Sequence, residues 1–136
     1  YPSKIILKLK QAEFLALTII NNETFIIGSN GKFISVEKFK NYENLPLVFG
    51  KFSPEKFINL KKIIYKSDLG YNNIKEIFFF PSGRIDIKSK NNILIKLPIQ
   101  DLENAFVIAN KIISKKNFNK NVIDLRIPNQ LILSNE

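Results

Sequence analysis

The sequence predicts one α+β domain, a predominantly antiparallel sheet with about two helices packed on one of its faces. Two patterns carry this prediction. Short apolar segments of strand length alternate with turns rich in Asn, Gly and Pro along most of the 136 residues. Two longer segments place apolar residues at helical spacing, i, i+3, i+4 and i+7. No internal repeat or low-complexity linker divides the chain.

The N-terminal part is expected to form a meander of short strands. Its strongest turn signal is Ser29-Asn30-Gly31, because Gly31 can take a positive φ. The charged stretch Val36–Glu43 is expected to be a loop, and the apolar segment Leu45–Gly50 follows it. The strands predicted in this part are Ser3–Leu9, Phe14–Ile20, Phe25–Gly28 and Lys32–Ser35.

The first helix is predicted to begin with Ser53 as its N-cap, Pro54 at the first helical position and Glu55 in the first turn. Gly70 is expected to stop it. Its lysines are interpreted as a solvated face rather than as a phosphate-binding stripe. The apolar face is predicted to contain Phe57, Leu60, Ile63 and Ile64.

Three strands should follow, and after them a second helix near Asp101–Ser114 that covers the dry face of the sheet. In the middle strand Ile85 and Ile87 alternate with charged residues, which predicts one buried and one wet face. The three strands are Asn73–Phe80, Arg84–Lys90 and Asn92–Leu97. The predicted apolar face of the helix contains Leu102, Ala105, Phe106, Ala109, Ile112 and Ile113.

The chain closes with two predicted strands, Val122–Arg126 and Leu131–Ser134, which turn through Pro128-Asn129-Gln130. The last strand stops where the chain stops, so its outer backbone groups could lack an internal partner. Two interpretations remain open from the residues alone. The pair either caps the sheet beneath a shielding loop or offers an edge to another protein.

The composition argues against an enzyme. Cys, His, Met and Trp are absent, which removes the thiol nucleophile, the imidazole base and the commonest transition-metal ligands. No phosphate-binding glycine loop or nucleophile elbow is present. Asp68, Asp86 and Asp101 each fit a structural position, with Asp86 on the wet strand face. Asp124 shares a strand face with Arg126, where a structural ion pair and a recognition role are both open. We predict no catalytic, cofactor-binding or metal-binding residue.

The net charge of +9 raises nucleic acid or anionic lipid as a partner, but the basic residues are spread along the chain and only two are Arg. Most of the 12 Phe and 4 Tyr fit core positions, while Tyr42 and Tyr71 are expected to be exposed. A basic nucleic-acid-binding module is therefore kept as the alternative function.

No membrane span or signal peptide is recognised. The chain begins at Tyr1-Pro2 rather than at Met, so we expect a fragment from which an anchor could have been removed.

Four segments, taken in order, resemble one family. They are an aromatic-Pro dipeptide leading into a strand (YPSKIILKL), a turn followed by GKF, a loop followed by LPLVFG, and the terminal VIDLRIPNQLIL. This order resembles the FtsQ/DivIB family of bacterial division proteins, particularly its alphaproteobacterial members. Asp124-Leu125-Arg126, followed by Pro128 and a last strand, is the most specific of these signals.

The resemblance implies a non-enzymatic scaffold of the division machinery. Family members are single-span inner-membrane proteins with a periplasmic POTRA module and a C-terminal β domain, and they act at the division septum. Residues 1–13 would be the last strand of a truncated POTRA module, and residues 14–136 the β domain. A related POTRA-bearing secretion or outer-membrane assembly component is a third possibility.

The resemblance also implies the partners, which are FtsB and, through it, FtsL, with no cofactor. FtsB would add a strand at the C-terminal edge of the sheet. Arg126 would meet an acidic residue of the partner, Ile127 would make an apolar contact, and Asn129 would supply the turn beside the edge. The receiving strand would consist of Leu131, Ile132, Leu133 and Ser134.

Overall fold

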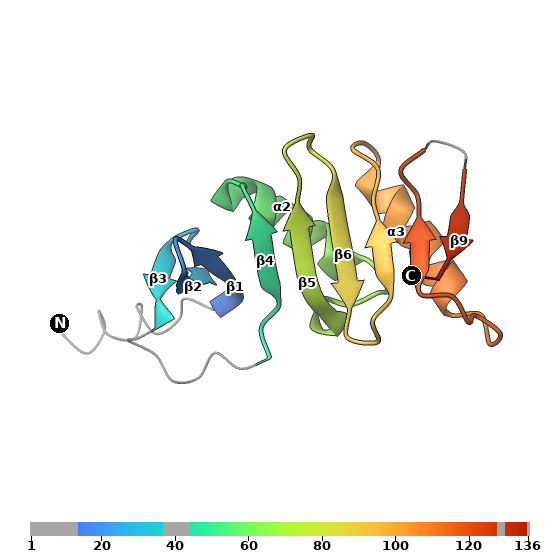
Figure 1. Ribbon diagram of the computed structural model, residues 1–136, viewed down its shortest axis with the longest axis horizontal. Coiled ribbons are helices and arrows are strands. Elements are labelled where there is room, and N and C mark those ends of the chain that lie inside the picture. The colour runs from blue at the N-terminus through green and yellow to red at the C-terminus, as the bar shows by residue number, and fades with distance from the viewer. Residues whose placement is uncertain (1–13, 37–43, 128–129, 136) are drawn as a thin grey trace.

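The computed structural model describes residues 14–36, 44–127 and 130–135. Within these ranges one nine-stranded sheet has the order β3-β2-β1-β4-β5-β6-β7-β8-β9, and its helices pack behind it (Figure 1). The expectation of an α+β fold with two helices and a large sheet is confirmed. The strands are β1 (Phe14–Ile20), β2 (Glu23–Gly28), β3 (Phe33–Ser35), β4 (Leu47–Gly50), β5 (Ile74–Phe79), β6 (Ile85–Ser89), β7 (Leu94–Lys96), β8 (Val122–Asp124) and β9 (Ile132–Ser134). The helices are α2 (Pro54–Lys66), the 3₁₀ turn η2 (Tyr71–Asn73) and α3 (Leu102–Ile113).

The sheet is mixed, so the prediction of a predominantly antiparallel sheet is wrong. The pairs β1–β4, β4–β5 and β7–β8 are parallel. Two of these pairs have a helix between their strands, α2 between β4 and β5 and α3 between β7 and β8. A helix returns the chain to the end of the sheet from which it came, and this return is what a parallel neighbour requires.

Both helices cover the same face of the sheet, as predicted. Strands β4, β5, β7 and β8 run in one direction, and both crossovers move the chain toward β9. Right-handed crossovers that move the same way place their helices on the same face. Phe57 of α2 and Phe106 of α3 are accordingly buried in one apolar cluster.

A row of apolar side chains crosses the sheet beneath these helices. Its members pair in register from strand to strand and are all fully buried: Val48, Ile77, Ile87, Ile95 and Ile123. The next residue in register is Leu133 of β9, which is 39% exposed. The apolar row therefore extends one strand further than the helical cover.

Local signals position the first elements much as predicted. The β1–β2 turn uses Asn21 and Asn22 with φ of 51° and 66°, and the next turn uses Gly31 with φ of 79°. Helix α2 begins as expected, since the Ser53 hydroxyl accepts a hydrogen bond from the Lys56 backbone N–H at 3.2 Å. None of the helices in the described ranges is long and apolar enough to cross a lipid bilayer.

The end of α2 differs from the prediction. The helix stops at Lys66 rather than continuing to Gly70. Ser67 leaves the helix in an extended conformation, and its hydroxyl donates to the Ile64 carbonyl at 2.6 Å, which satisfies one of the last free carbonyls. Gly70 instead precedes η2 with φ of 80°.

Some predicted elements lie outside the described residues. These are the strand Ser3–Leu9 with the rest of the POTRA segment 1–13, most of the loop Val36–Glu43 with Tyr42, and Pro128-Asn129 of the last turn.

Tyr71, expected to be exposed, is buried, with 7% of its surface accessible. Its hydroxyl donates to the Leu15 carbonyl at 2.6 Å. The β1–β2 register is irregular between Phe14 and Ala16 and skips Leu15, so the tyrosine provides a partner for a carbonyl at this irregularity. Burial and the nearby Tyr65 raise the pKa of Tyr71.

We expect Tyr71→Phe to lower the free energy of unfolding by about 1 to 3 kcal/mol, because it leaves the buried Leu15 carbonyl without this donor. Urea denaturation measures the change. Tyr65→Phe is the matched control, since Tyr65 is well exposed and should tolerate the change. Equal stability of the two variants would contradict a structural role for the Tyr71 hydroxyl.

Candidate functional site

Strand β9 forms an edge of the sheet and pairs with β8 (Figure 1). All three of its residues are exposed, including Ile132 at 47%. An antiparallel strand bonds to a neighbour through the backbone groups on one side only. The other side of β9 faces no described strand. This edge is therefore able to accept a strand from another chain.

The opposite edge of the sheet is better covered. The residues of β3 are all half-buried, and Phe33 packs against Phe52 with ring centroids 5.9 Å apart. An edge with covered side chains offers a partner less apolar surface to bury. Of the two edges that the structure describes, β9 is thus the stronger candidate for an intermolecular contact.

The edge is apolar on both faces of the sheet. Leu133 pairs with the buried Ile123 and so lies on the helix side, whereas Ile132 pairs with Asp124 and lies on the open side. A strand added beside β9 would meet an apolar neighbour on each face. Such pairs of cross-strand neighbours provide side-chain specificity beyond the backbone hydrogen bonds.

Arg126 lies two residues beyond Asp124, the last residue of β8, and forms a two-pronged ion pair with it. The Arg126 Nε donates to Asp124 Oδ1 at 2.9 Å, and an Arg126 terminal nitrogen donates to Oδ2 at 2.7 Å. The hydrogen bond from Arg126 holds the pKa of Asp124 below its usual range, and the same pair raises the pKa of Arg126. The structural ion pair, one of the two roles left open by the sequence, is present. Arginine has five N–H donors, so this pair leaves donors available for a second carboxylate.

A line of alternating charges leads across the open face to this pair. Asp86 is in register with Lys96, and Lys96 with Asp124. The expectation that Asp86 is on a wet face is wrong, since only 5% of it is exposed, and Arg84 covers it with an Nε–Oδ1 distance of 3.1 Å. Burial raises the pKa of Asp86, and the charges of Arg84 and Lys96 oppose this rise.

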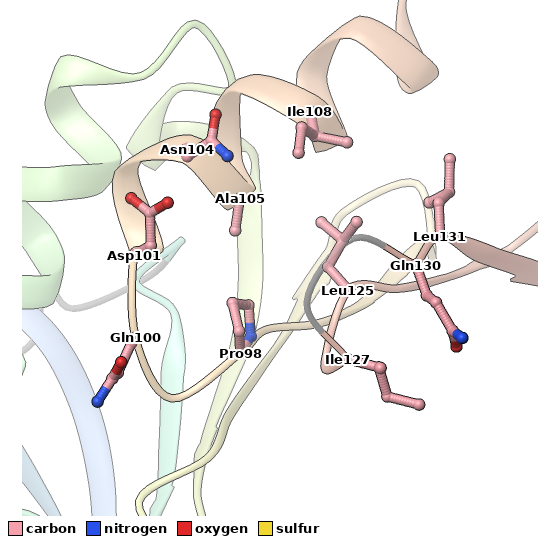
Figure 2. A pocket seen from close by; sticks show the side chains of 10 residues that line it. All are labelled: Pro98, Gln100, Asp101, Asn104, Ala105, Ile108, Leu125, Ile127, Gln130 and Leu131. Atoms are coloured by element: carbon pink, nitrogen blue, oxygen red, sulfur yellow. The ribbon is translucent and has the colours of Figure 1, made fainter.

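A groove of about 530 Å³ lies on the helix side, between the first half of α3 and the β8–β9 connection. Figure 2 shows Ala105 and Ile108 of α3 on one side of it and Leu125 and Leu131 on the other. Asp101, Asn104 and the glutamines 100 and 130 contribute polar groups. The groove thus continues the apolar surface of the edge beneath the sheet.

The sequence-based prediction missed the α3 side of this groove. Ile108 was not assigned to the buried face of the helix, and it is half-buried at the flank of that face. The sequence did contain a signal, because Ile108 is an apolar residue of the predicted helix that the predicted buried face does not include. Leu125, which was not singled out as a site residue, lines the groove with 6% exposure.

Nearly all the residues predicted from the family resemblance come together at this edge. Ile127 is 52% exposed and Leu131 is 46% exposed, and both line the groove. Arg126, Ile132, Leu133 and Ser134 are exposed beside it, while Asn129 lies outside the described residues. Among the described residues no group of three or more acidic, His or Cys side chains is placed to hold a metal ion. The surface consists mainly of exposed apolar side chains, with the Arg126–Asp124 ion pair beside them.

We expect the Asp124 pKa to lie below its usual range and to rise in Arg126→Gln, which removes the ionic hydrogen bonds. Because the folded state lowers this pKa, the pair stabilises the fold above the unfolded-state pKa, and its contribution is lost as the pH falls through the folded-state pKa. Carboxyl ¹³C NMR titration measures both proteins. In Arg126→Lys the Asp124 pKa should stay partly lowered. An Asp124 pKa that is the same in both variants as in the wild type would show that Arg126 does not lower it.

Comparison with known proteins identifies similar sequences. A family model for the C-terminal domain of cell division protein FtsQ/DivIB matches residues 16–126, so the match ends within the β8–β9 connection. Cell division protein FtsQ from Bradyrhizobium diazoefficiens is 22% identical over 136 residues, covering 98% of this chain. The chain spans 40% of that relative's length.

A solved structure shares the fold. The major extracytoplasmic domain of the trans isomer of the cell division protein DivIB from Geobacillus stearothermophilus matches with a TM-score of 0.50. The match covers 71% of this chain and 86% of that chain, at 13% sequence identity. At this identity the likeness concerns the arrangement of the elements.

Proposed function

The chain belongs to the FtsQ/DivIB family of cell division proteins, and from this premise we propose that it binds a division partner by accepting a strand at β9. The observation that carries the proposal is the open edge of β9, with every residue of the strand exposed. Strand addition supplies main-chain hydrogen bonds that need no particular side chain, and flanking side chains select the partner.

The partner that we propose is FtsB and, through it, FtsL, as the family resemblance implies. Arg126 receives an acidic residue of FtsB with the donors that Asp124 leaves available. Leu131, Ile132, Leu133 and Ser134 form the receiving edge, with Asn129 in the turn beside it, and Ile127 adds an apolar contact. The family assignment supports this role over a nucleic-acid-binding module, for which net charge and aromatic content are the only arguments.

We further propose the setting of the complex. The domain is a non-enzymatic scaffold on the periplasmic side of the inner membrane, at the division septum, held by a membrane span outside this chain. Residues 1–13 are the last strand of a POTRA module, and residues 14–136 are the β domain. The relative from Bradyrhizobium is more than twice as long as the matched region, which leaves room for these parts.

Ending the chain after residue 129 should abolish binding of a peptide from the C-terminal region of FtsB. The truncation removes the receiving strand but none of the side chains of the buried cluster. Calorimetric titration measures the binding, and circular dichroism verifies that the truncated core is folded. In the intact chain, the peptide should slow hydrogen exchange at β9 amides. Normal binding by the folded, truncated protein would rule out strand addition.

Arg126→Glu should weaken binding of the same peptide by about tenfold or more. The substitution removes a charge-assisted hydrogen bond and places a carboxylate near the partner's acidic residue. The melting temperature should fall only slightly, since the Asp124–Arg126 pair that is lost is exposed and exposed pairs contribute little to stability. Lys62→Glu on α2 is the control of equal charge change at an exposed position remote from β9 in Figure 1. Unchanged affinity in Arg126→Glu would remove Arg126 from the site.

A further inference from the structure

A cluster of lysines lies next to the proposed docking edge. Residues 104–123, which include most of α3 and the loop that follows it, contain four Lys and no Asp or Glu. All four lysines are exposed: Lys111, Lys115, Lys116 and Lys120. We call these residues the lysine cluster. Four like charges without an acidic residue in the same segment create a local positive field beyond that of scattered surface charges.

Hydrogen bonds hold the end of the lysine-bearing segment beside one end of β9. The Asn121 backbone N–H donates to the Ser134 carbonyl and to Asn135 Oδ1, each at 3.2 Å. Lys120 directly precedes Asn121, so the lysine-bearing loop ends where β9 ends. A strand laid along β9 would therefore have this lysine-bearing loop near its Ser134 end.

The groove beneath the edge also leads toward the lysine cluster. Ile108 lines the groove opposite Leu131 (Figure 2). Lys111 follows Ile108 by three residues, so helical spacing places it on the same flank of α3. Asp101 lies at the other end of the groove, at the start of the helix. The groove therefore runs from Asp101 at its acidic end, between apolar side chains, toward the lysine cluster.

The two ends of the edge differ in how their charges are balanced. At the Ile132 end of β9, Arg126 is paired with Asp124. At the Ser134 end, the segment that carries the lysine cluster has no acid of its own. An incoming strand with carboxylates at one end would gain more at the Ser134 end than at the Arg126 end. Charge complementarity of this kind contributes mainly specificity and association rate.

Building on the proposed strand addition, we infer that the partner segment has an acidic cluster immediately beyond the strand, and that the lysine cluster selects it. The partner is then a peptide of roughly four to six strand residues, apolar on both faces, with Asp or Glu residues where it passes Ser134. The lysine cluster sets the direction in which this strand lies along β9. It adds a second, electrostatic contact to the backbone pairing.

The test uses the intact chain and the FtsB peptide described above, in its natural form and in a form with the Asp and Glu residues flanking its strand changed to Asn and Gln. The variant Lys116→Glu/Lys120→Glu reverses two charges of the lysine cluster. The control variant Lys62→Glu/Lys66→Glu makes the same charge change at exposed positions of α2. Stopped-flow fluorescence measures association rates at about 50 and 500 mM NaCl, where screening differs strongly.

We expect the lysine variant to slow association of the natural peptide by roughly fivefold at low salt and little at high salt, with the control near wild type. The neutralised peptide should bind wild type slowly and should not distinguish the lysine variant from the control. Equal association rates for the lysine variant and the control would overturn the inference. So would a natural FtsB peptide that carries no Asp or Glu beside its strand and still binds as expected.

Other outcomes separate this inference from the proposed function. If removing residues 130–136 abolishes binding but the lysine variant binds normally, strand addition holds and the acidic contact is wrong. If the natural peptide binds as well without residues 130–136, strand addition fails, and the inference fails with it. Binding of a single-stranded oligonucleotide that only the lysine variant loses, with peptide binding unchanged, would assign the cluster to nucleic acid instead.

Discussion

Burial of one apolar row across the sheet is the constraint on which the rest of the structure depends. The row runs in register from Val48 to Ile123, and each fully buried side chain of this size stabilises the fold by about 1.5 to 3 kcal/mol. Covering the row requires both helices on one face, which leaves the other face to the charge line that ends at Asp124. The row also extends one strand beyond the helices that cover it, which leaves Leu133 exposed.

Local elements could be predicted because each has its own signal in neighbouring residues. Ser53 and Pro54 mark the start of α2, and the alternation around Ile85 and Ile87 marks a strand with two different faces. The parallel pairs were missed because they depend on long-range chain order. The succession of strand, helix and strand held that information, since a helical crossover joins parallel neighbours.

The errors in burial have the same cause. Tyr71 is buried in the core, and its hydroxyl donates to the carbonyl of Leu15, which is 56 residues away in sequence. Asp86 lies on the face that alternation assigns to it, but Arg84 and the neighbouring strands cover it. The edge residues near Arg126 were predicted from the family resemblance together with the terminal position of the strand. The groove beside them was not, because it forms only when α3 packs next to the β8–β9 connection.

Strand β9 contributes no buried side chain, so its attachment rests on backbone pairing with β8. Such segments open locally at a lower free-energy cost than strands that fill the core. A partner that requires β9 in place binds only the attached population, so its apparent Kd is the intrinsic Kd divided by the attached fraction. Substitutions at Val122 or Ile123, one strand further in, would change affinity by shifting that fraction. Attachment of β9 is in this sense an internal equilibrium that sets how strongly the edge can be occupied.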